Sequence, residues 1–250
     1  MSRYFSKIGV WLFMLTVAWY LAGNFLLNNV KKEQLSHAQS IHVTKQQADI
    51  GSNNRAVIRT QDTDARGVEI DLIFDPAATQ AMISNENMQL GASAQFIDGV
   101  FNITIGKGVA TRGGYPRGKT EIRLPATVSK VEFFGVSNVR ISGSFPAQST
   151  ELTVEFLNSA SRVTVNELLV SRLKLVSGCQ SPAQENDCSL NLDFNGQIQV
   201  AKLEMTMQHG SLNYSGIGVP QETLLNAGSD VIVTGRRDFL QSLRFGSGKR

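Results

Sequence analysis

A short alternation of apolar and polar residues returns about every twenty residues through the second half of the chain, and it constrains the fold more than any other feature. The alternation begins at Val131, Leu152, Leu173, Leu203, Leu225 and Leu243, and most steps are 18 to 22 residues long. Self-similarity at such a period is typical of repeat architectures in which each turn of chain stacks on the previous one. The sequence therefore predicts an all-β fold, a β-solenoid of parallel, β-helix-like stacked rungs whose repeats begin at about residue 121.

Each predicted rung carries up to three short strands, as at residues 152–154, 163–165 and 168–170. Side chains alternate faces along a strand, so the first and third residue of each triplet are expected to point into an apolar interior and the middle residue toward solvent. Glycine, Asn and Ser at the corners accept the turn conformations that close each rung. Neighbouring rungs would bury the apolar faces that one rung cannot bury alone.

Ahead of the repeats, strand-like runs occur at residues 41–43, 57–59, 68–74, 100–105 and 121–124. Between them, Asp75 precedes Pro76, which combines a good N-cap residue with a proline at the first helical position. This pattern predicts one short helix at residues 77–87. The strands and this helix are expected to cover one end of the stack.

Residues 8–27 form a run of twenty residues without a charge, long enough as a helix to span the hydrocarbon of a bilayer. We expect an uncleaved signal anchor at residues 1–30 with a cytoplasmic tip, a polar stalk at 31–40 and the β-solenoid domain at 41–250. A cleaved signal, with a cut after Ala18, and a helix buried in a soluble protein are the alternatives. The basic residues that flank the run, Arg3 and Lys7 before it and Lys31 and Lys32 after it, leave the orientation nearly tied.

Two cysteines, Cys179 and Cys188, bracket a polar insertion where the repeat step lengthens to 30 residues, from Leu173 to Leu203. A disulfide there would close a short loop, and such bonds persist in oxidising compartments. The alternative is a pair of free thiols in a cytosolic loop. The disulfide favours a single-pass inner-membrane protein with its body in the periplasm, or a secreted protein if the signal is cleaved.

The charge pattern excludes one class of partner. Beyond Arg3 and Lys7, 22 basic residues face 21 acidic ones, so the body carries no electrostatic signature for nucleic acid. The partners that remain are the membrane, through the single N-terminal span, and an envelope protein or glycan. The sequence leaves the oligomeric state open.

No motif for catalysis, cofactor binding or metal binding is found. The three histidines, His37, His42 and His209, lack partners at triad or metal-site spacing, and the Gly-rich basic segment 106–119 lacks the strand-to-helix context of a phosphate loop. We therefore predict no catalytic residue, no cofactor and no metal.

A carbohydrate-active β-helix protein, which binds or cleaves polysaccharide, is the rival interpretation. Cleavage would need paired acids on adjacent rungs. The predicted outward row of the first strand instead mixes charges of both signs and indicates a salt-bridged face, at Glu132, Thr153, Lys174, Glu204, Asn226 and Arg244. The row of the second strand is polar and holds no acid pair, at Arg140, Thr164, Asn191, Asn213 and Ile232. Asp193, Glu155 and Asp230 are the acids that could still converge.

The segment TEIRLPATVSKVEFFGVSNVRISGSF (120–145) resembles the auto-transporter adhesin head GIN domain family, a β-solenoid domain of unknown function. The resemblance extends over about residues 40–248 and includes IHVTKQQADI, DGVFNITIG and the corners GSDV and SNVRI. The Cys179–Cys188 insertion and the corners NSAS (158–161) and FNGQ (194–197) depart from the family pattern. The resemblance implies a cell-envelope location and an adhesive role without catalytic residues. We expect a membrane-anchored, non-enzymatic interaction or adhesion scaffold.

Overall fold

The computed structural model describes residues 44–48, 54–60, 68–85, 92–97, 100–106, 118–146, 150–158, 160–179 and 188–246. These residues belong to one compact unit, Val43–Arg250. The predicted membrane segment 8–27, the stalk 31–40 and the expected strand at 41–43 lie outside the described residues. Within the ranges above, no helix has the length and apolar character that a membrane span requires.

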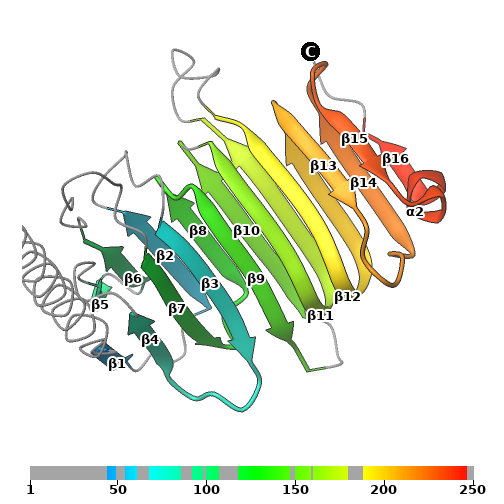
Figure 1. Cartoon of the computed structure of the whole chain (residues 1–250). Coiled ribbons are helices and arrows are strands. Elements are labelled where there is room, and N and C mark those ends of the chain that lie inside the picture. Colours follow the sequence, from blue (N-terminus) through cyan, green and yellow to red (C-terminus); the bar gives the residue numbers. More distant parts are fainter. Residues whose placement is uncertain are drawn as a thin grey trace, which may run out of the picture. The chain divides into compact units, whose positions relative to one another are not determined.

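The described unit is all-β apart from one short helix, which confirms the predicted all-β class (Figure 1). The strands of the first half are β1 (Thr44–Ala48), β2 (Arg55–Thr60), β3 (Val68–Asp75), β4 (Ala81–Asn85), β5 (Ala92–Ile97), β6 (Val100–Ile105), β7 (Gly118–Pro125) and β8 (Lys130–Phe134). They are followed by β9 (Asn138–Ser144), β10 (Glu151–Leu157), β11 (Ser161–Gly178), β12 (Leu190–Met207), β13 (Gly210–Tyr214), β14 (Glu222–Ala227), β15 (Ile232–Gly235), the helix α2 (Arg237–Ser242) and β16 (Leu243–Phe245).

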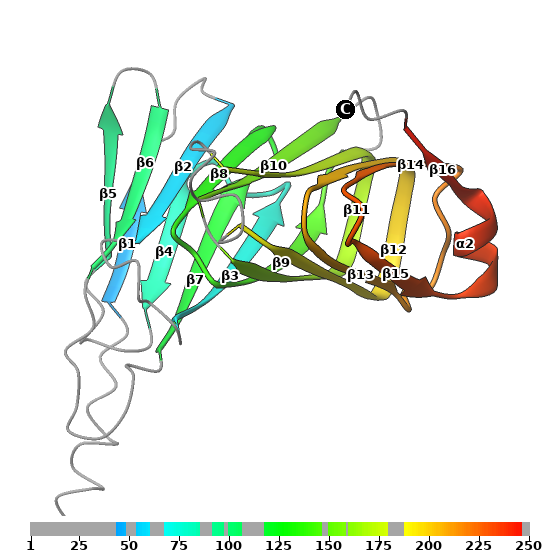
Figure 2. The same cartoon turned by 90° about the horizontal axis from the view of Figure 1, so that it is seen from above.

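All these strands join one sheet, which doubles back on itself at the long strands β11 and β12. The first strip of the sheet contains β7, β3, β9, residues 161–166 of β11, residues 190–195 of β12, β13 and β15. The second strip contains β6, β2, β8, β10, residues 172–178 of β11, residues 202–207 of β12, β14 and β16. Figure 2 shows the two strips facing each other, with β10 and β14 on one side and β9 and β13 on the other.

Strands within each strip run parallel, and each residue stands opposite its counterpart from the previous passage of the chain. Leu152 pairs with Leu173, Leu173 with Leu203, and Thr223 with Leu243. The first and third of these steps are 21 and 20 residues, and the second is the predicted 30-residue step that contains the cysteine insertion. One passage of the chain through both strips is called a coil below.

Three of the predicted alignments are wrong by two residues; one of them is that of Leu225, which stands opposite Phe245 rather than Leu243. Val131 stands opposite Val154 rather than Leu152, and Leu203 stands opposite Thr223 rather than Leu225. Because side chains alternate with a period of two, a two-residue shift leaves every residue on the same face and changes only its neighbours. The apolar alternation predicts the faces and cannot fix the register.

Every second residue of each strip points inward, and these residues form one apolar core. None of the described inward-pointing residues is charged. Its aromatic rings stack from coil to coil: Phe133 lies 5.2 Å from Phe156, and Phe194 lies 5.3 Å from Tyr214. Helix α2, which the sequence did not predict, closes the column by placing the fully buried Phe239 ring 4.1 Å from Tyr214. Stacked rings of this kind stabilise the core beyond their buried area.

The predicted helix at residues 77–87 is wrong, because residues 81–85 form strand β4. β4 pairs antiparallel with both β1 and β7, and its Ala81, Ile83 and Asn85 are buried in strict alternation. Asp75 and Pro76 instead form a turn, in which the Ala77 amide donates to the Asp75 carboxylate at 2.9 Å. Asx turns and helix N-caps use the same side-chain hydrogen bond, so the local signal does not distinguish them.

The second and third strands expected in one rung, residues 163–165 and 168–170, are parts of the single strand β11. Between them Glu167 adopts a left-handed backbone conformation with φ 51°, and the pairing register shifts there. Beyond this bulge, residues 168–170 still alternate, with Leu168 and Val170 buried and Leu169 exposed. A bulge re-aims the strand, and here it creates a short third surface between the two strips.

The disulfide prediction is confirmed: Cys179 and Cys188 are bonded, with their Cα atoms 6.0 Å apart. Cys179 directly follows β11 and Cys188 comes two residues before β12. The bond therefore ties the ends of two neighbouring strands across the insertion. Restriction of this loop in the unfolded chain contributes about 2 to 3 kcal/mol.

Candidate functional site

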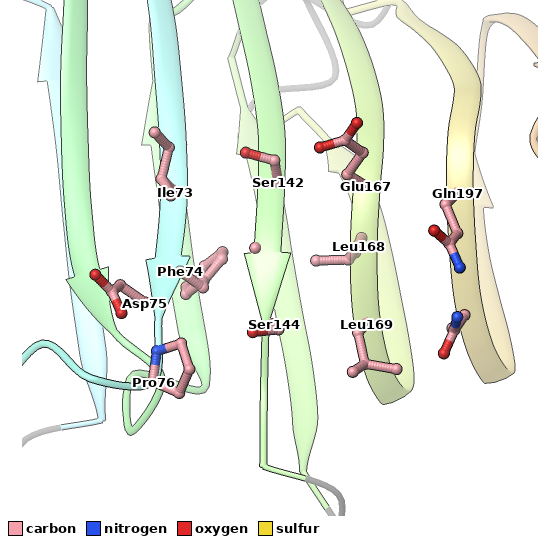
Figure 3. Close-up of a pocket in the computed structure, with 12 residues that line it drawn as sticks. Ile73, Phe74, Asp75, Pro76, Ser142, Ser144, Glu167, Leu168, Leu169 and Gln197 are labelled. Atoms are coloured by element: carbon pink, nitrogen blue, oxygen red, sulfur yellow. The ribbon is translucent and has the colours of Figure 1, made fainter.

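The short third surface carries a groove of about 550 Å³ that crosses four neighbouring strands. β3, β9, β11 and β12 each contribute side chains to it, and Figure 3 shows these side chains side by side on their strands. One row across the groove consists of Ile73, Ser142, Glu167 and Gln197. The outermost of these residues, Ile73 and Gln197, are 124 residues apart in the chain. Only the pairing of the coils brings the four together.

A second row runs beside the first, through Asp75, Ser144, Leu169 and Gln199. Leu169 pairs with Ser144 on one side and with Gln199 on the other, and 42% of its surface is exposed. An adjoining hollow of about 400 Å³ shares Leu169 and Gln199 and extends to Val219 and Gln221. The two hollows adjoin at Leu169 and Gln199 and are together called the groove below; their lining combines hydroxyl, amide and apolar groups.

Most polar groups of this groove are not engaged with the rest of the protein. Glu167, Gln197 and Gln199 are exposed, and their side chains make no hydrogen bond or ion pair with any residue that the structure describes. Asp75 differs, because its carboxylate accepts the Ala77 amide. Side chains without internal partners are available to a ligand, and the rigid sheet beneath them fixes the backbone positions from which they project.

The outward side chains of the second strip form ion-pair networks. Glu132, whose side chain is only 5% exposed, accepts two hydrogen bonds from Arg55 at 3.0 and 2.8 Å and one from Lys130 at 3.0 Å. Lys130 also lies 3.1 Å from Glu155 and so bridges two carboxylates of adjacent coils. Burial opposes the ionisation of Glu132, but the hydrogen bonds from Arg55 and Lys130 outweigh it and hold its pKa below the ordinary value.

A second network continues along the same strip. Arg172 contacts Glu204 at 2.7 Å and Glu151 at 3.3 Å, while Lys202 contacts Glu204 at 3.0 Å and Glu222 at 3.6 Å. The hydrogen bond from Arg172 is the main cause that lowers the pKa of Glu204. The second strip is a salt-bridged face, but Glu132 and Glu204 are the members of the predicted row that take part in these pairs, and their partners lie outside that row. Its neighbours differ from those expected, because Glu132 aligns with Glu155 and Asn226 aligns with Thr206.

The first strip carries the predicted polar ladder, again with a corrected register. Thr164 stands opposite Asp193 rather than Asn191, and Asn213 stands opposite Thr234 rather than Ile232. Asn213 donates to Asp193 at 3.1 Å and Thr234 donates to Asn213 at 3.2 Å. The polar side chains of the ladder therefore hydrogen-bond to one another from coil to coil. The ladder includes Asp193, an acid that the predicted row left out.

The acids proposed for a carbohydrate-cleaving site do not converge. Asp193 lies on the first strip and Glu155 on the second, and each is bound by its own partner, Asn213 and Lys130. Asp230 contacts Nδ1 of His209, a pairing that the sequence did not indicate because the two residues belong to successive coils. His37 and His42 lie outside the described residues. The described ranges hold no cluster of three or more residues suited to a metal ion.

The Gly-rich segment 106–119 falls mostly outside the described residues, which include only its two ends, Gly106 and residues 118–119. The groove residues were missed by the sequence analysis. Glu167 was not singled out in the sequence, and Asp75 was interpreted as a helix cap. The Asp75–Pro76 turn signal was visible in the sequence, whereas nothing in the sequence indicates that Glu167, Gln197 and Ile73 meet on one surface.

No protein-family model matches the chain, and no curated protein matches it. The resemblance to the head GIN domain family therefore stays a prediction. Among solved structures, a "putative cell adhesion protein" from Clostridium sporogenes ATCC 15579 is 10% identical, with a TM-score of 0.28 over 78% of this chain and 100% of that one. A "putative adhesin" from Bacteroides fragilis NCTC 9343 is 12% identical, with a TM-score of 0.33 over 79% of this chain and 98% of that one. TM-scores this low do not establish a shared fold.

Proposed function

We propose that the body of this protein is a β-solenoid that serves as a non-enzymatic interaction or adhesion scaffold at the cell envelope, with the groove on its third surface as the binding face. The N-terminal segment 8–27 anchors it in the inner membrane, and the body lies in the periplasm. In this arrangement the scaffold presents its groove to an envelope protein or glycan.

The observation that carries this proposal is the groove over β3, β9, β11 and β12, whose exposed Glu167, Gln197 and Gln199 have no partner among the described residues. The strands beneath it are held by a fully buried core. A rigid backbone loses little conformational entropy when a ligand binds, so the entropic cost is confined to the side chains that the ligand immobilises. The described acids outside the groove are engaged with partners of their own, which favours binding over cleavage.

The Cys179–Cys188 disulfide supports the compartment, because such bonds are rare in the reducing cytosol and persist in the periplasm. A protease-protection assay on spheroplasts tests this part. We expect externally added protease to degrade the body in spheroplasts and to leave it intact in whole cells. Protection in spheroplasts would place the body in the cytoplasm and contradict the proposal.

The binding face is tested in cells with the full-length protein. A photo-crosslinking amino acid at Gln199 places the reactive group in the groove, and the same amino acid at Thr153, on the outward row of the second strip, is the matched control. We expect the Gln199 variant to form a discrete adduct with envelope material and the Thr153 variant to form none. A Leu169→Glu substitution should abolish the Gln199 adduct, because it puts a charge in the centre of the groove.

Two outcomes would contradict the proposal. Equal adducts from Gln199 and Thr153 would mean that the groove is not the binding face. Release of reducing sugar from envelope polysaccharide by the purified protein would establish the carbohydrate-cleaving rival.

A further inference from the structure

Glu167 occupies a backbone conformation that glutamate rarely adopts. Its φ of 51° lies in the left-handed region, where a side chain with a Cβ is strained and glycine is not. Among the described residues, the other non-glycine residue with positive φ is Asn158, and asparagine tolerates this region. A strained residue persists where the surrounding fold imposes it, and strain of this kind clusters at binding sites.

In the next coil, a glycine adopts the left-handed conformation at the corresponding bulge. In the pairing of β11 with β12, the bulge around Glu167 faces Gly196 and Gln197, and Gly196 holds the left-handed conformation with φ 69°. The bulge therefore does not require a glutamate. What glutamate adds is an exposed carboxylate in the middle of the first groove row, between Ser142 and Gln197.

The lining of the groove indicates what this carboxylate would meet. None of the described residues that line the two hollows is Lys, Arg or His, so the groove offers nothing to neutralise an anionic ligand. It does offer amides and hydroxyls that both donate and accept hydrogen bonds, at Gln197, Gln199, Gln221, Ser142 and Ser144. Leu169 adds an exposed apolar surface among them.

A hydroxyl-rich ligand fits this combination better than a polycationic one. Asp75 accepts the Ala77 amide and keeps its charge, so the groove holds two carboxylates, of which Glu167 has no partner among the described residues. One carboxylate can accept hydrogen bonds from two neighbouring hydroxyls, while amides bind further hydroxyls and Leu169 contacts the C–H face of a ring. A polycation would need several free carboxylates.

We propose that the groove binds a neutral glycan chain and that Glu167 is its hydroxyl-accepting residue, held in a strained conformation for that purpose. This inference rests on the proposed role of the groove as the binding face and names its ligand class. The rows cross four strands spaced about 4.8 Å apart, so the groove accommodates a ligand of several sugar rings running perpendicular to the strands.

The test uses the full-length protein purified in a mild detergent, with cellohexaose, maltohexaose and chitohexaose as neutral probes and hexalysine as the cationic probe. We expect at least one hexasaccharide to bind in calorimetry and hexalysine not to bind. Glu167→Gln keeps the side-chain size and removes the charge, and it should weaken the binding about 10-fold or more. Glu167→Gly removes the carboxylate together with the strain and should weaken the binding at least as much.

Thermal unfolding separates the two roles of Glu167. We expect Glu167→Gly to raise the Tm by up to about 3 °C and Glu167→Gln to leave it unchanged, because only glycine relieves the backbone. A lower Tm for Glu167→Gly would contradict the claim that the backbone of Glu167 is strained. Wild-type affinity in both variants would show that Glu167 is not a binding residue.

Failure of this inference differs from failure of the proposed function. If Leu169→Glu abolishes hexasaccharide binding while both Glu167 variants bind normally, the groove remains the binding face and the role of Glu167 is wrong. If hexalysine binds and no hexasaccharide does so at concentrations up to about 10 mM, the glycan assignment is overturned. If no probe binds at these concentrations, the glycan assignment is likewise overturned. Hexasaccharide binding that Leu169→Glu leaves intact would place the ligand outside the groove and contradict the proposed function itself.

Discussion

The second strip and the groove share the strands β11 and β12, yet their polar side chains differ: those of the second strip are paired with one another, and those of the groove are not. On the second strip, Glu132, Glu155 and Glu204 are each bound by an arginine or lysine of the same or an adjacent coil. In the groove, Glu167 and Gln199 project into solvent with no partner among the described residues.

This difference separates a surface that holds the coils together from one that is available to a ligand. Charges that neutralise one another across coils are already desolvated in part and offer little to a binding partner. Unsatisfied side chains above a rigid core can exchange water for ligand without breaking an internal bond. The predictions below test whether stability depends on the second strip and binding on the groove.

The largest effects are expected in the core that both surfaces share. Phe156 lies beneath the second strip and Leu168 beneath the groove, and each is at most 1% exposed. We expect Phe156→Ala to lower the free energy of unfolding by about 3 to 5 kcal/mol and Leu168→Ala by about 2 to 5 kcal/mol in urea titrations. Leu240→Ala, at a half-exposed position of α2, is the control and should cost much less. A loss below about 1 kcal/mol for Leu168→Ala would mean that the groove has no rigid support.

The next effect concerns Glu132. Glu132→Gln preserves its volume and leaves Arg55 and Lys130 without this carboxylate, although both can turn to solvent because their side chains are 45% and 38% exposed. We expect a loss of about 1 to 3 kcal/mol in the free energy of unfolding, less than for a fully buried pair. Glu151→Gln breaks an exposed contact with Arg172 and should change the free energy by less than about 0.5 kcal/mol. Equal changes in the free energy of unfolding for the two substitutions would show that Glu132 stabilises the fold no more than the exposed Glu151 does.

A smaller effect is expected from acid. The pKa values of Glu132 and Glu204 are lowered in the folded protein below their ordinary value of 4.5. The folded state therefore binds these protons less readily than the unfolded state, so the stabilisation is complete above the ordinary value and is lost as the pH falls through the lowered ones. We expect the Tm to fall from about pH 5 downward, and a Glu132→Gln, Glu204→Gln double variant to show a shallower decline. A decline of unchanged slope would assign the acid sensitivity to other carboxylates.

The smallest effect on stability is expected in the groove. Leu169→Gln and Gln199→Ala remove exposed side chains that the fold does not use, so the free energy of unfolding should change by less than about 0.5 kcal/mol for each. Leu169→Gln should weaken capture of the envelope partner by the crosslinking amino acid at position 199, and both substitutions should weaken the binding of a hexasaccharide. If a groove variant lost more free energy of unfolding than Glu132→Gln, stability would depend on the groove more than on the second strip, contrary to our expectation.

Much of the fold could be predicted because its signals are local. Apolar alternation identified the strands around Leu152, Leu173 and Leu203, and charge alternation identified the salt-bridged face. The antiparallel strand β4 was mistaken for a helix, because its turn signal at Asp75 is shared by both structures and only the open edges of β1 and β7 decide between them. The groove was not predicted at all.

The sequence by itself determined that the body is built of strands and which residues of each strand face the core, and it indicated a bond between Cys179 and Cys188. Each of these follows from the order of side chains over a few residues, because a strand alternates its faces and a short loop holds its two ends together. The tertiary structure alone decided which residues stand opposite one another and where the groove lies. A shift of two residues keeps every face unchanged, so the neighbours of Glu167 are set by how the coils align and by the bulge that turns the chain at that residue.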